Sequence, residues 1–158
     1  MRPATAALAL LLVAGAAPAR AQDRFTDIIA RAPESSVRNG YVVNHRREAV
    51  QREITARPPT EAELGVRLPP GARLVPDRTA LQIVQYNPVW RVYQYRVAMS
   101  REELVRFFTE QGLEYDASQQ WLYFPGGRKK EGGFIDDLHH GAQGIRIWRR
   151  PAAASAAP

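Results

Sequence analysis

Residues 90–112 read WRVYQYRVAMSREELVRFFTEQG, and this stretch decides the fold. Over its first ten residues, aromatic and β-branched side chains alternate with a period of two, which predicts a half-buried strand. One face of this strand holds large apolar side chains, namely Tyr93, Tyr95, Val97 and Met99. The other face is mixed and holds Trp90, Val92, Gln94 and Arg96.

The second half of the same stretch predicts a helix over 101–111. Ser100 and Glu103 have the spacing of a capping box, in which each side chain binds the backbone N–H of the other residue. Leu104, Phe107 and Phe108 then follow at helical spacing, and Gly112 stands where a left-handed residue ends many helices. We expect the apolar stripe of this helix to cover the Tyr93 and Tyr95 face of the sheet.

The flanking segments complete an α+β fold with an antiparallel sheet of about four strands and one main amphipathic helix on one face. The run Leu81–Tyr86 is interpreted as a strand, joined to the next one by a turn at Asn87-Pro88. Further strands are predicted at 119–124 and 144–149. These elements form one domain over residues 66–150, and the alanine-rich tail over 151–158 is predicted to be disordered.

A helical or irregular N-terminal arm over residues 22–65 precedes this domain. The sequence predicts helices over 23–32 and 46–56, a turn at Asn39-Gly40 with a short strand after it, and a capping box at Thr60 and Glu63. The arm has too few apolar residues for a core of its own. We therefore expect it to lie against the main domain or to be partly mobile.

Residues 1–21 have the three parts of a secretory signal peptide. A basic start is followed by a small and apolar run over 6–17, and Ala19 and Ala21 form an A-x-A cleavage site. Cleavage there removes Arg2 and Arg20, which lowers the formal charge from +6 to +4. The chain is predicted to be exported, to the periplasm or the medium, and to keep no transmembrane segment after cleavage.

The composition limits the possible chemistry and partners. The chain has no cysteine, so thiol catalysis and disulfide bonds are excluded. Its basic residues are nearly all arginine, a bias typical of high-G+C bacterial genes, and the net charge is modest. Nucleic acid is therefore an unlikely partner, and no nucleophile elbow or other catalytic arrangement is recognisable.

The long glycine-rich connection over 126–144 holds the one candidate metal site. Asp136, Asp137, His139 and His140 would converge on one ion if this segment formed a helical turn, and His45 would be the only further imidazole available. Carboxylate and imidazole ligands suit zinc. The alternative, which we favour, is a mobile, solvated loop that the fold does not need.

The mixed face of the sheet is the candidate binding surface. Trp90 and Arg96, with Arg146 and Trp148 from the last strand, would form an aromatic and basic surface that stacks on rings and pairs with anions. The alternative, which we favour, is that the N-terminal arm covers this face and an arginine stem covers each tryptophan.

These observations favour a non-catalytic exported module that needs no cofactor and binds an unidentified protein or an envelope component. The alternative is a small metal-dependent hydrolase that uses zinc in the loop from Asp136 to His140.

Export gives the first testable prediction. When the full chain is produced in a bacterial host, we expect the exported protein to begin at or near Gln22, because the cleavage site follows Ala21. Intact-mass measurement of the exported fraction checks this. An exported protein that retains residues 1–21 would contradict it.

Overall fold

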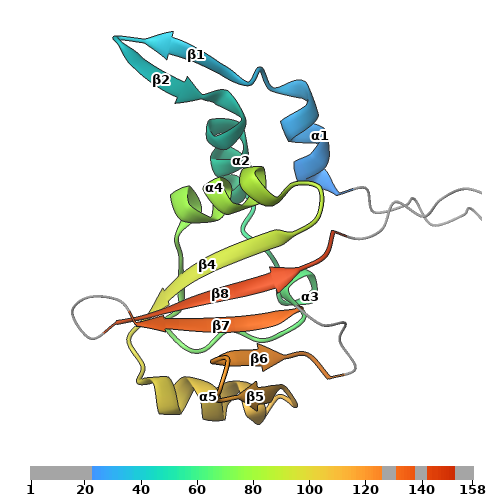
Figure 1. Ribbon diagram of the computed structural model, residues 1–158, viewed down its shortest axis with the longest axis vertical. Coiled ribbons are helices and arrows are strands. Elements are labelled where there is room, and N and C mark those ends of the chain that lie inside the picture. The colour runs from blue at the N-terminus through green and yellow to red at the C-terminus, as the bar shows by residue number, and fades with distance from the viewer. Residues whose placement is uncertain (1–22, 126–130, 138–141, 152–158) are drawn as a thin grey trace, which may run out of the picture.

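A computed structural model describes residues 23–125, 131–137 and 142–151 of the chain. Within these ranges the protein is an α+β fold with a six-stranded antiparallel sheet, several helices and a separate two-stranded hairpin (Figure 1). The helices are α1 (Arg24–Arg31), α2 (His45–Ala56), α3 (Glu61–Leu64), α4 (Pro76–Tyr86) and α5 (Arg101–Thr109). The strands are β1 (Ser35–Arg38), β2 (Tyr41–Asn44), β3 (Arg73–Leu74), β4 (Arg91–Val97), β5 (Glu114–Asp116), β6 (Trp121–Tyr123), β7 (Gly132–Asp137) and β8 (Gln143–Arg149).

The longest ladder of the sheet joins β4 to β8. The strand order is β3-β4-β8-β7-β6-β5, and the pairing of β4 with β8 runs from Arg91 opposite Arg149 to Val97 opposite Gln143. Alternation along the strands places large apolar side chains on one face, which we call the inner face. Its buried residues are Tyr93, Tyr95, Val97, Leu122, Ile135, Ile145 and Ile147.

Helix α5 confirms the prediction from the capping box. The Glu103 carboxylate accepts a hydrogen bond from the Ser100 N–H at 2.8 Å, and the Ser100 hydroxyl accepts one from the Glu103 N–H at 3.2 Å. The first of these bonds lowers the pKa of Glu103 below its ordinary value. Phe108 is buried in the core and Phe107 only partly so, and Gly112 has the expected positive φ of 90°.

The N-terminal arm contributes to the same core as the sheet. Asp23 caps α1, Asn44 caps α2, and Thr60 forms the predicted capping box at the start of α3. The arm's buried apolar side chains join one cluster with those of the inner face; they are Phe25, Ile29, Val50, Ile54 and Leu64. Among the described elements of the arm, only the β1–β2 hairpin projects away from the body (Figure 1).

The prediction of a strand at Leu81–Tyr86 is wrong, because these residues belong to helix α4. Pro76 occupies the first helical position, where its missing N–H is no loss, and the buried Thr79, Ala80 and Ile83 recur at helical spacing. The Thr79 hydroxyl accepts a hydrogen bond from the Gln94 N–H at 2.9 Å, so the helix covers the edge of β4. The predicted hairpin is therefore a connection from a helix to a strand.

The prediction of a dispensable loop over 126–144 is also wrong for 132–137. These residues form β7, which pairs with β6 on one side and β8 on the other, and Ile135 is fully buried. Gly132 permits this close pairing, because a Cβ there would lie 1.9 Å from the Leu122 carbonyl oxygen. The sheet consequently has six strands rather than about four, and the fold has more than one main helix. None of the helices in the described ranges is long and apolar enough to cross a membrane.

Two substitutions in α5 separate packing from capping. Phe108→Ala removes a buried ring, and we expect it to lower the free energy of unfolding by roughly 3–5 kcal/mol. Ser100→Ala removes a cap and should cost about 1 kcal/mol. Chemical denaturation measures both costs. A larger cost for Ser100→Ala would contradict the placement of Phe108 in the core.

Two adjacent glycines test the position of β7. Gly132→Ala forces a methyl group onto the backbone of β6, and we expect a cost of roughly 1–3 kcal/mol or more. Gly133→Ala is the matched control, because its methyl group would have ordinary contacts of 3.7–3.8 Å. Thermal and chemical unfolding should show that only the first change is destabilising. Equal effects would contradict the pairing of β6 with β7.

Candidate binding surface

The face of the sheet opposite the core, the outer face, is built from alternate residues of four adjacent strands. Trp148 of β8 lies between Val92 of β4 and Gly132 of β7 in the ladder. One step along, Phe134 of β7 lies between Arg146 of β8 and Trp121 of β6. Because side chains of one register row point the same way, these residues form one continuous surface.

Six aromatic side chains of this surface touch one another, and we call them the aromatic cluster: Tyr86, Trp90, Trp121, Tyr123, Phe134 and Trp148. The ring of Trp148 is central, with centroids 5.1 Å from Tyr86 and 6.1 Å from both Trp90 and Trp121. The tilted and edge-to-face angles between the rings are favourable aromatic geometries. The cluster is therefore held in place before any partner arrives.

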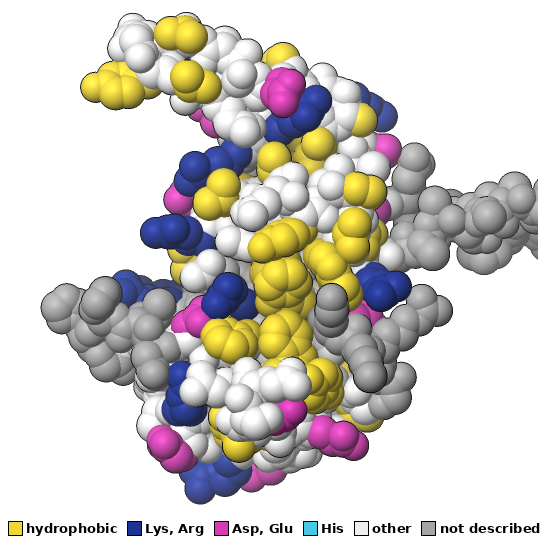
Figure 2. Space-filling model, viewed as in Figure 1, with side chains coloured by type: hydrophobic (Ala, Val, Ile, Leu, Met, Phe, Trp, Pro, Cys, Tyr) yellow, Lys and Arg dark blue, Asp and Glu magenta, His cyan; other side chains and the backbone are white. Residues whose placement is uncertain are grey.

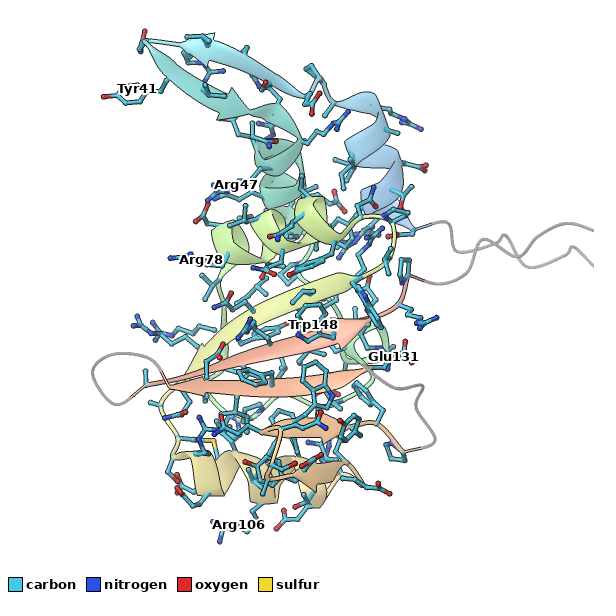
Figure 3. The ribbon with its side chains drawn as sticks, viewed as in Figure 1. Tyr41, Arg47, Arg78, Arg106, Glu131 and Trp148 are labelled. Carbon is cyan, nitrogen blue, oxygen red and sulfur yellow. The ribbon has the colours of Figure 1, made fainter. Side chains whose placement is uncertain are left out.

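The aromatic cluster is partly exposed. All six of its residues have intermediate exposure. Figure 2 shows hydrophobic side chains gathered over the middle of the molecule, where Figure 3 places Trp148 in front of β8. An exposed group of large aromatic rings on a folded domain commonly marks an interaction site. In Figure 1 helix α4 borders this face along β4, and no described helix crosses the front of β8, β7 and β6, so the arm does not cover the aromatic cluster as the alternative interpretation expects.

The four predicted binding residues lie on this surface. Trp90 and Trp148 belong to the aromatic cluster, and Arg96 is exposed on the outer face of β4. Arg146 stacks over the Phe134 ring at 4.9 Å and pairs with Asp136 at 2.7 Å. The charge of Arg146 is thus already compensated within the protein.

The predicted binding residues include only two of the six members of the aromatic cluster, Trp90 and Trp148. Alternation over 121–124 separates Trp121 and Tyr123 from Leu122, and it was the available signal for an aromatic face on β6. The sequence carries no signal that Phe134 and Tyr86 belong to this face. The segment of Phe134 is predicted to be a loop, and the segment of Tyr86 is predicted to be a strand.

The candidate metal residues are only partly within the described ranges. Asp136 and Asp137 lie on a strand, not on a helical turn, and Arg146 already engages the Asp136 carboxylate. His45 begins α2 next to Ser36 and Glu48, away from β7. His139 and His140 lie outside the described residues, so zinc binding there stays a prediction. The described residues contain no group of three or more side chains suited to hold a metal.

No protein-family model, curated protein or solved structure matches the chain.

Proposed function

We propose that the protein is a non-catalytic exported module that binds a component of the cell envelope through the outer face of its sheet. The observation that supports this most is the aromatic cluster, whose six rings are packed together and partly exposed. The predicted signal peptide supports a protein that acts outside the cytoplasm.

The shape and chemistry of the cluster favour a glycan as the ligand. Aromatic faces carry negative partial charge, and they attract the weakly positive C–H groups on the flat faces of sugar rings. Rings spread over α4, β6, β7 and β8 offer several such contacts in a row. A glycan chain can therefore lie along the surface with successive sugars on successive rings.

Two arginines beside the cluster favour acidic sugars. Arg96 is exposed on the outer face, and no hydrogen bond or ion pair ties its side chain within the described ranges. Arg150 lies over the Trp90 ring at 5.1 Å, where the ring supports its guanidinium. Planar guanidinium groups bind carboxylates through two parallel hydrogen bonds. We therefore propose an acidic glycan as the ligand class.

All three tryptophans of the chain belong to the aromatic cluster, so their fluorescence reports on this surface. We expect polygalacturonate to change the emission in a saturable way, and neutral dextran to bind more weakly. Trp148→Ala should weaken binding about tenfold or more, equivalent to ~1.4 kcal/mol.

Tyr41→Ala is the matched control, because Tyr41 is an aromatic side chain that is 77% exposed on the β1–β2 hairpin, outside the cluster (Figure 3). It should leave the affinity unchanged, and circular dichroism should show that both variants are folded. A lack of saturable binding to either glycan, or equal losses in the two variants, would contradict the proposal.

A further inference from the structure

A hollow on the inner-face side of the sheet, near Tyr93, is lined by several arginines. It has a volume of about 610 Å³ and lies between α1, the end of α2, α3 and the end of β8. The arginines that line it are Arg24, Arg57, Arg91, Arg149 and Arg150. Its apolar wall is formed by Phe25 and Tyr93, whose ring centroids are 6.4 Å apart. We call it the arginine pocket.

The carboxylates near the pocket compensate three of these arginines. Asp23 pairs with Arg91, which is 3% exposed and also hydrogen-bonded to Thr26 and Asn87. Burial lowers the pKa of Arg91 to about 10, so it remains a cation at neutral pH.

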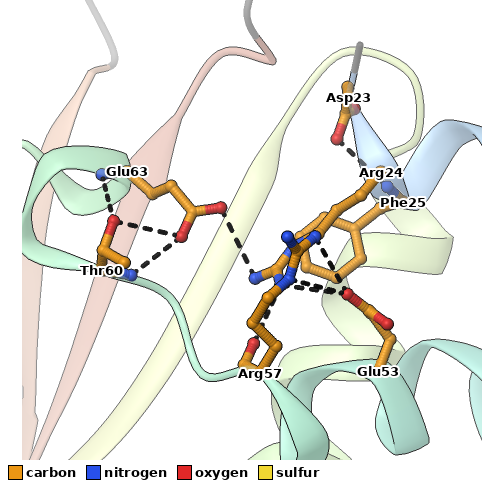
Figure 4. A network of polar contacts seen from close by, with 7 residues as sticks. All are labelled: Asp23, Arg24, Phe25, Glu53, Arg57, Thr60 and Glu63. Carbon is orange, nitrogen blue, oxygen red and sulfur yellow. Dashed lines mark hydrogen bonds and ion pairs between the residues drawn. The ribbon is translucent and has the colours of Figure 1, made fainter. Parts of the chain in front are cut away.

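Figure 4 shows the other carboxylates. Glu53 accepts hydrogen bonds from Arg24 at 3.1 Å and from Arg57 at 3.2 Å. Glu63 lies 3.5 Å from Arg24 and also caps α3 through the Thr60 N–H at 2.8 Å. Five arginines thus face these three carboxylates, and a fourth carboxylate, Glu131, lies at the Arg150 N–H, so the pocket keeps a net positive charge.

Arg149 and Arg150 are the two lining arginines whose guanidinium groups form no ion pair within the described ranges. Arg149 lies over the Phe124 ring at 4.5 Å, and its guanidinium carbon is only 3.1 Å from the position that a Cβ would take at Gly65. Arg150 lies over Trp90, and its backbone N–H donates to Glu131 at 3.0 Å. Within the described ranges neither guanidinium has a carboxylate partner. Stacking on rings fixes both groups and leaves their N–H edges available.

We propose that the arginine pocket binds a small molecule that carries a phosphate group, held by Arg149 and Arg150. A phosphate monoester has a charge near −2 at neutral pH, which suits the net positive charge of the pocket. Its three terminal oxygens can accept hydrogen bonds from two guanidinium groups at once. The two oxygens of a carboxylate are already occupied when they accept both bonds of one guanidinium group. The volume beyond the phosphate, with Phe25 and Tyr93 on the wall, accommodates an apolar or aromatic substituent.

Isothermal titration calorimetry of the exported chain at low salt tests this with inorganic phosphate, phenyl phosphate and succinate. We expect phenyl phosphate to bind most tightly, inorganic phosphate more weakly, and succinate least. Added sodium chloride should weaken the binding, because the pocket is open to solvent and its charges are screened. No detectable heat with either phosphate at millimolar concentration, or preference for succinate, would overturn the proposal.

Arg149→Gln should weaken phenyl phosphate binding at least tenfold, while its melting curve shows a folded protein. Arg106→Gln is the matched control, because Arg106 is an exposed arginine on α5 at the far end of the molecule (Figure 3). Equal losses in the two variants would also overturn the proposal. Arg96→Gln should leave phenyl phosphate binding unchanged, because Arg96 lies on the outer face and does not line the pocket.

Discussion

The register of β4 against β8 determines which side chains the two faces of the sheet present. Tyr93 opposite Ile147 and Tyr95 opposite Ile145 place both apolar rows against the helices. A slip of one residue would exchange the faces, burying Trp148 and Arg146 and exposing the core. The same register sets Arg91 directly opposite Arg149, a like-charged pair that is unfavourable by itself. Asp23 at the start of α1 compensates Arg91, and the neighbourhood of Arg149 becomes the arginine pocket.

Arginine has a structural role here that lysine could not fill. Arg24, Arg146, Arg149 and Arg150 each lie over an aromatic ring, at 4.5–5.1 Å from the ring centroid. A planar guanidinium stacks on a ring and still donates hydrogen bonds from its edge, whereas an ammonium group is compact and strongly hydrated. From the composition alone, the abundance of arginine is explained by coding bias. In the structure, four of these arginines also share one packing role, because each stacks on an aromatic ring.

The sequence predicted those elements whose signals are local. A capping box fixes the start of a helix through contacts between residues three positions apart, so both partners are visible in a short stretch of sequence. The chain has two, at Ser100 with Glu103 and at Thr60 with Glu63. Helix α4 was missed because six residues that alternate along 81–86 resemble a strand, while its buried Thr79 and Ala80 lie just outside that window. Segment β7 is a strand because it pairs with β6 and β8. Its own glycine-rich residues carry no local signal for that pairing.

The sequence predicts only Trp90 and Trp148 of the six rings in the aromatic cluster, for a related reason. Alternation within one strand separates its two faces, but which face is buried depends on the helices that cover the sheet. Trp90, Arg96, Arg146 and Trp148 were grouped correctly on one face. The contact between Trp148 and Trp121 crosses β7, so it follows only once that strand is placed.

The position of β8 in the chain has a consequence for how the protein is made. Residues paired between β4 and β8 are 46 to 58 positions apart, and β8 is the last strand of the described chain. During synthesis, β4 leaves the ribosome well before its main partner exists. The inner face of β4 then stays without this neighbour until β8 has been made, so the two strands pair only after all the described elements between them have been synthesised.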